Sequence, residues 1–213
     1  MSYADNPGFL DAEACTRQFL TPAQEILGER LTGVIFEQEY QKKSESPSAE
    51  ENIGELDGFF SRLEDDVQPH IELRSPHLLV PPYFDWLETR SIGYVFSHWT
   101  WLPSLREQWK LSGGRFTAKD GNAVVRLLTP LRMKYEDAYA LSHPFDKPVP
   151  ELAESPQTRD MIADVAALVY QAMERDAMLD VIINNRVYGN APSLGQAIAY
   201  RVLKEEERRS QLS

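Results

Sequence analysis

Residues 181–193, VIINNRVYGNAPS, contain the pattern that is most informative about the fold. The stretch begins with a short apolar run, which is typical of a buried strand, and continues into polar residues. Gly189 permits a tight turn, Asn190 is a favourable helix N-cap, and Pro192 suits a first helical turn. The stretch therefore predicts a strand that leads through a polar end into a helix.

The same succession of strand and helix occurs along most of the chain. The predicted strands are residues 33–38, 70–74, 92–98, 123–128 and 179–183. The predicted helices are residues 11–27 and 49–63, a helix opened by Pro81 and Pro82, part of 99–109, a helix after Ser155-Pro156, and residues 192–206. Short apolar strands without clean alternation indicate a parallel sheet covered by helices.

We expect one domain over residues 1–213, in which residues 129–154 form a long inserted loop. The pattern alone leaves two folds open, a doubly wound sheet and a (β/α)8 barrel. The first strand is not followed by Gly-x-Gly-x-x-Gly, so the usual dinucleotide fingerprint is missing.

Composition and charge disfavour or exclude several classes of protein. The 213 residues carry a net charge of -11, which disfavours nucleic-acid and membrane-surface binding. Cys15 is the only cysteine, which excludes an intrachain disulfide and a cysteine-rich zinc site. The sequence shows no signal peptide and no membrane-spanning stretch, so we expect a cytoplasmic protein without membrane partners.

Five short segments, taken in order, resemble the YecE family of bacterial and archaeal proteins, a domain of unknown function described as related to sugar isomerases. The segments are GVIFEQ at 33–38, IELR at 71–74, VVRL at 124–127, IINN at 182–185 and GNAP at 189–192. The resemblance covers about residues 9–203 and implies an α/β fold of the (β/α)8 TIM-barrel type.

The chain departs from the family pattern in several places. Leu128-Thr129 stands where the family has His-Gly, Glu39-Tyr40 replaces Pro-Pro, and the sequence after Arg74 differs from the family's. The family's first three strands would precede Gly33, and this sequence has no room for them there. We therefore expect an incomplete barrel of about five strands, equivalent to strands four to eight. Three explanations stay open: a C-terminal fragment, closure by another chain, or a rearranged open sheet.

In barrels, functional groups lie at the carboxyl ends of the strands. On that basis the candidate catalytic residues are Glu72 and His98, as an acid or base. The candidate ligand-binding residues are Gln38, Arg74, Arg126, Asn184, Asn185 and Gly189.

Each candidate also has a purely structural interpretation. Glu72 and Arg74 lie two apart on one strand, hence on one face, and can line a site or pair with each other. Arg126, among apolar neighbours, needs an anionic partner, which is either Glu72 or a ligand. His98 can equally be a loop histidine held by capping bonds.

The turn that opens the last predicted helix offers an anion site at a helix N-terminus, but ordinary capping by Asn190 explains the same residues. Glu37, Glu72 and His98 are metal-ligand types without metal-ligand spacing, so we predict no metal and no cofactor.

Three functions follow. The first is binding of a small polar or anionic, sugar-like ligand in the barrel mouth. The second is a non-catalytic interaction module whose open sheet edge docks on a second copy or a complementing chain. The third is a metal-dependent barrel enzyme of the endonuclease or sugar isomerase type, which the net charge of -11 disfavours for nucleic acid.

Overall fold

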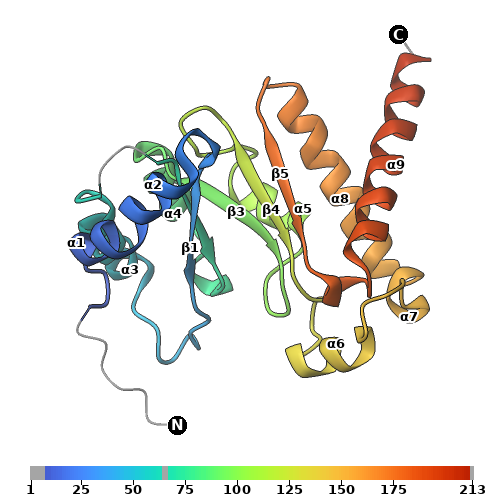
Figure 1. The fold of residues 1–213 in the computed structure, drawn as a ribbon, viewed down its shortest axis with the longest axis horizontal. Helices are drawn as coiled ribbons and strands as arrows, with labels where there is room; N and C mark the ends of the chain where they lie inside the picture. The colour runs from blue at the N-terminus through green and yellow to red at the C-terminus, as the bar shows by residue number, and fades with distance from the viewer. Residues whose placement is uncertain (1–7, 64–66, 212–213) are drawn as a thin grey trace.

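The computed structural model describes residues 8–63 and 67–211, which form a parallel sheet with helices packed along it (Figure 1). The sheet has five strands in the order β1-β2-β3-β4-β5, and every neighbouring pair is parallel. The strands are β1 (Val34–Gln38), β2 (Pro69–Leu73), β3 (Gly93–His98), β4 (Ala123–Leu127) and β5 (Leu179–Ile183). The predicted α/β fold with about five parallel strands is confirmed. Each observed strand begins and ends within one residue of the predicted bounds.

Helices occupy nearly all of the connections. They are α1 (Ala12–Cys15), a π-helical turn (Thr16–Leu20), α2 (Thr21–Leu27), α3 (Ala49–Phe60), α4 (Pro81–Thr89), α5 (Leu105–Leu111), α6 (Tyr135–Ser142), α7 (Pro150–Ala153), α8 (Pro156–Met173) and α9 (Ala191–Ser210). Short 3-10 turns lie at Gly28–Arg30, Pro76–Leu78 and Asn185–Val187. None of the helices in the described ranges is long and apolar enough to cross a bilayer.

The inserted segment 129–154, predicted as a loop, contains two short helices. Both α6 and α7 lie where β4 and β5 end (Figure 1), and α6 packs on the turn that follows β5. The segment therefore packs over the carboxyl ends of β4 and β5 as a pair of short helices.

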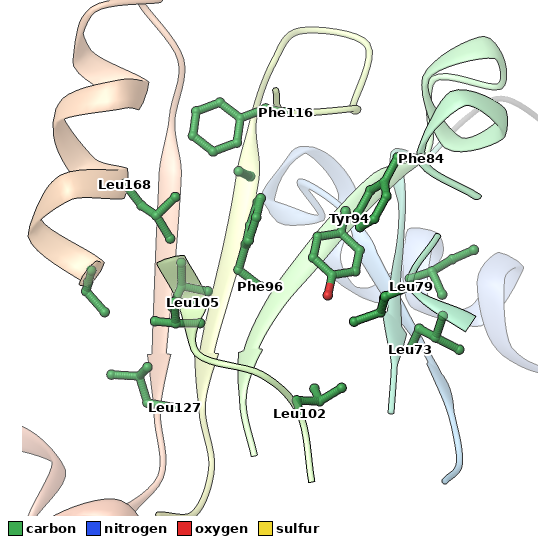
Figure 2. Packing of buried hydrophobic residues seen from close by; sticks show 14 of the residues in the cluster. Leu73, Leu79, Phe84, Tyr94, Phe96, Leu102, Leu105, Phe116, Leu127 and Leu168 are labelled. Atoms are coloured by element: carbon green, nitrogen blue, oxygen red, sulfur yellow. The ribbon is translucent and has the colours of Figure 1, made fainter. Parts of the chain in front are cut away.

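The core lies between one face of the sheet and the helices (Figure 2). Tyr94 and Phe96 of β3 point to this side, with their ring centroids 4.9 Å apart, and Phe84 of α4 lies 5.0 Å from Tyr94. Leu105 of α5 and Leu168 of α8 close the layer. Because side chains alternate along a strand, the residues between these point to the opposite, inner face.

One buried glutamine fixes α5 against β3. Gln108 accepts hydrogen bonds from the Tyr94 hydroxyl at 2.9 Å and from the Ser97 backbone N–H at 3.1 Å. Its amide nitrogen donates to the Ser97 carbonyl at 2.8 Å. Gln108 thereby fixes the backbone of Ser97 from the helix side of the sheet, while the Ser97 side chain projects from the inner face.

Candidate functional site

Four charged side chains meet on the inner face, near the carboxyl ends of the strands. They are Glu37 on β1, Glu72 and Arg74 at the end of β2, and Arg126 on β4, and we call them the charged cluster. Register aligns Glu37 with Glu72 on neighbouring strands. Pairing of Glu72 with Arg74 or Arg126 was one of two alternatives that the sequence left open, beside ligand binding, and the structure contains both contacts.

The carboxylate of Glu72 is the centre of the cluster. It is fully buried, and it accepts hydrogen bonds from the Ser97 hydroxyl at 2.5 Å and from Nη1 of Arg126. Nε of Arg74 lies 3.6 Å from Oε1 of Glu72, the oxygen that also accepts from Ser97. A buried carboxylate is stable only with such partners, because the cost of removing it from water is otherwise several kcal/mol.

Glu37 links the two arginines at the outer side of the cluster. Its Oε2 atom accepts from Nη2 of Arg74 at 2.7 Å and from Nη1 of Arg126 at 3.2 Å. The Glu37 side chain is 37% exposed, whereas Arg74 and Arg126 are 19% and 21% exposed. One accessible carboxylate therefore bridges two largely enclosed guanidinium groups.

The arginines keep donors that the described residues do not use. The hydrogen bonds of Arg126 involve Nη1, and the side-chain hydrogen bond of Arg74 involves Nη2. Burial lowers the pKa of Arg74, and the nearby Glu37 and Glu39 oppose that change. Two guanidinium groups, each with spare N–H groups, can hold a carboxylate or phosphate.

An aromatic group lies beside the cluster, formed by Tyr40, Trp99 and Trp101. The Tyr40 ring lies 6.1 Å from Trp99 and 6.4 Å from Trp101, centroid to centroid. The guanidinium of Arg74 lies 5.1 Å from the Trp99 ring centre, and the Tyr40 and Trp101 rings are exposed. These three residues were not among the predicted site residues, although each follows a strand end by one to three positions.

The structure does not place His98 with Glu72. Its side chain points to the face opposite that of Ser97, and Nδ1 lies 2.9 Å from the Thr129 carbonyl oxygen. Burial lowers the pKa of His98 to about 4, so the ring is neutral at pH 7. It borders a separate cavity of about 850 Å³ that Asp160 and Asp164 of α8 also line.

Gln38 also points away from the charged cluster. It follows Glu37 on β1, and its amide nitrogen donates to Asn52 Oδ1 of α3 at 2.5 Å. It lies on the side of the sheet that α3 covers, where it lines a cavity.

The polar turn after β5 is held by its own side chains. Asn184 Oδ1 accepts from the N–H of Arg186, and Asn185 Oδ1 accepts from the N–H of Ala191 at 2.8 Å. Asn190 Oδ1 accepts from the N–H of Ser193 at 3.0 Å. Because Pro192 has no N–H, these bonds use the donors of the first turn of α9 that an anion would need.

Gly189 is required by the same turn. It adopts φ +97°, and a Cβ atom there would lie 2.6 Å from the Lys147 carbonyl oxygen. Asn184, Asn185 and Gly189 thus shape the link between β5 and α9, and none of them is bonded to the charged cluster in the described chain. Across residues 8–63 and 67–211, no three His, Cys, Asp or Glu side chains are grouped as a metal site.

Two solved structures share the fold. The first is a DUF72 family protein from Thermotoga maritima, which is 15% identical, with a TM-score of 0.53 over 92% of this chain and 65% of that one. The second is a DUF72 family protein from Enterococcus faecalis, which is 16% identical, with a TM-score of 0.59 over 95% of this chain and 68% of that one. No protein-family model and no curated protein matches the chain. The chain thus spans about two thirds of the length of these structures, and the likeness is one of fold.

Proposed function

We propose that the charged cluster binds a small, sugar-like molecule that carries a carboxylate or phosphate. The observation that carries this proposal is the position of Glu37, whose exposed carboxylate bridges Arg74 and Arg126 at 2.7 and 3.2 Å. A ligand anion that takes this position gains both guanidinium groups and releases Glu37 to water.

The buried carboxylate gives the site its rigidity. Glu72 stays bonded to Ser97 and Arg126 when Glu37 leaves, so the arginines remain oriented. The contacts of Glu72 with Arg74 and Arg126 suit it to the role of a positioning group for the two guanidinium groups. His98 lies on the other face and has no part in this binding site.

The aromatic group supports a ring-shaped ligand body. Trp99 lies beside Arg74, and the exposed Tyr40 and Trp101 rings next to it offer flat apolar surfaces on which the C–H face of a sugar can pack. The ligand class is therefore a sugar acid or a sugar phosphate, and the chain's net charge of -11 disfavours a polynucleotide.

Binding of glucose 6-phosphate, glucose and inorganic phosphate by calorimetry tests the proposal. We expect glucose 6-phosphate to bind most tightly, Arg126→Met to abolish binding, and Glu37→Gln to strengthen binding several-fold because the competing carboxylate is gone. Arg115→Met is the matched control, since Arg115 pairs with Asp85 and Glu88 outside the cluster. Equal binding by the Arg126→Met and Arg115→Met variants would refute the proposal.

We also propose that the chain is a YecE-like barrel piece equivalent to strands four to eight, with a complementing chain at an open sheet edge. Among the described strands, β1 and β5 each pair on one side, and Ile182 of β5 is 44% exposed on the inner face. A second copy or a separate chain that supplies strands would cover both features. Light scattering tests this: we expect an assembly that Ile182→Lys weakens, and a monomer at every concentration without any co-purifying chain would exclude it.

A further inference from the structure

A second cavity lies on the helix side of the sheet, between the N-terminal helices, β1 and α3. Its volume is about 790 Å³, within the range of small-molecule sites of about 300–1,000 Å³. Phe36, Phe59 and Phe60 form an apolar wall, and Phe9 and Phe19 border it from the N-terminal segment. Glu37 borders the cavity, but the other β1 side chains of the wall, Phe36 and Gln38, point to the face opposite that of the charged cluster.

Two amide side chains in the wall, those of Gln38 and Asn52, each have one polar atom that is hydrogen-bonded and one that is not. Gln38 Nε2 donates to Asn52 Oδ1, which leaves Gln38 Oε1 and Asn52 Nδ2 without a partner among the described residues. Asn52 is 2% exposed, so bulk water does not satisfy it. Exchanging N and O in both amides reverses the bond and again leaves one donor and one acceptor unpaired.

The unpaired groups specify what would complement them. A ligand with an adjacent N–H and C=O supplies a donor for one amide and an acceptor for the other. The terminal torsion of Gln38 is broad, so its amide can turn toward the cavity. Gln41 Oε1, also in the wall, is a further unpaired acceptor.

The charges around the cavity select against anions. Asp11, Glu39 and Glu55 border the cavity, and no lysine or arginine among the described residues lines it. A neutral ligand is therefore favoured over a carboxylate or phosphate, in contrast to the charged cluster.

We propose that this cavity binds a neutral aromatic carboxamide or lactam, whose ring packs on Phe36, Phe59 and Phe60 and whose amide edge bonds to Gln38 and Asn52. The buried, unpaired Asn52 amide and the phenylalanine wall together carry the inference. It is independent of ligand binding at the charged cluster.

Fluorine NMR of 4-fluorobenzamide with the full chain tests the proposal. We expect its Kd to be at least about tenfold lower than the Kd of 4-fluorobenzoate, which carries a charge, and of fluorobenzene, which lacks the amide. Two variants locate the site. Ala14→Phe fills the cavity from α1 and should abolish binding, and Asn52→Leu should remove the preference for the amide over fluorobenzene.

The matched control is Ala199→Phe, which adds the same ring to an exposed position of α9, beyond β5. Loss of binding in Ala14→Phe with retention in Ala199→Phe would support the proposal. No binding of 4-fluorobenzamide, equal affinity for the three probes, or full binding by Ala14→Phe would overturn it. Because Ala14→Phe fills space without removing a buried group, this outcome does not depend on whether Asn52→Leu folds.

Discussion

Replacing Arg126 by methionine should destabilise the protein through the carboxylate that it leaves behind. Arg126 donates to Glu72, which is completely buried, and also lies 3.2 Å from Glu37. Removing one partner of a buried ion pair costs about 3–5 kcal/mol. Arg126 is 21% exposed, and Arg74 remains 3.6 Å from Glu72, so we expect a smaller loss of about 2–3 kcal/mol.

Urea denaturation at pH 7 measures this loss directly, and a thermal scan should show a fall in Tm of about 4–12 °C.

The double variant Glu72→Met/Arg126→Met is the control, because it removes both charges and keeps apolar volume. It should be more stable than Arg126→Met alone. If the single variant loses less than about 0.5 kcal/mol, or the double variant is less stable than the single one, the buried carboxylate is not the source of the effect.

Three further predictions concern the scaffold. Gly189→Ala should cost at least about 2 kcal/mol in urea denaturation, because of φ +97° and the close Lys147 carbonyl, whereas Gly58→Ala in α3, with open space around it, should stabilise by about 0.5–1 kcal/mol. His98 has a folded pKa of about 4, below the value of 6.5 for the exposed ring, so its contribution to stability is present above pH 6.5 and is lost as the pH falls toward 4. The stability of His98→Gln should therefore fall less between pH 7 and 4 than that of the unaltered chain. Gln108→Ala should cost about 2–4 kcal/mol by the same assay, because it leaves buried polar groups of β3 unpaired.

The strands were predictable because each is a short apolar run followed by a helical segment. Their parallel order follows from the same pattern, since helical crossovers connect parallel neighbours. The helices inside 129–154 were missed because the prolines at 130, 144, 148 and 150 interrupt any periodic pattern.

The charged cluster was predictable in part. Residues two apart on a strand share a face, so the sequence alone places Glu72 and Arg74 together. The place of Glu37 depends on the register between β1 and β2, and sequence gives no register between strands 30 or more positions apart. The position of His98 depends on register in the same way, because the pairing of Ser97 with Arg126 shows that His98 points to the other face.

The charged cluster also has a consequence for how the strands find their alignment. Its members come from β1, β2 and β4, and Glu37 and Arg126 are separated by 89 positions in the chain. If any of these strands shifted by one residue, its charged side chain would turn into the apolar layer around Phe96 and lose its partners. The cluster thus destabilises each arrangement in which one of these strands is shifted. It favours the single alignment in which β1, β2 and β4 are all in their native register.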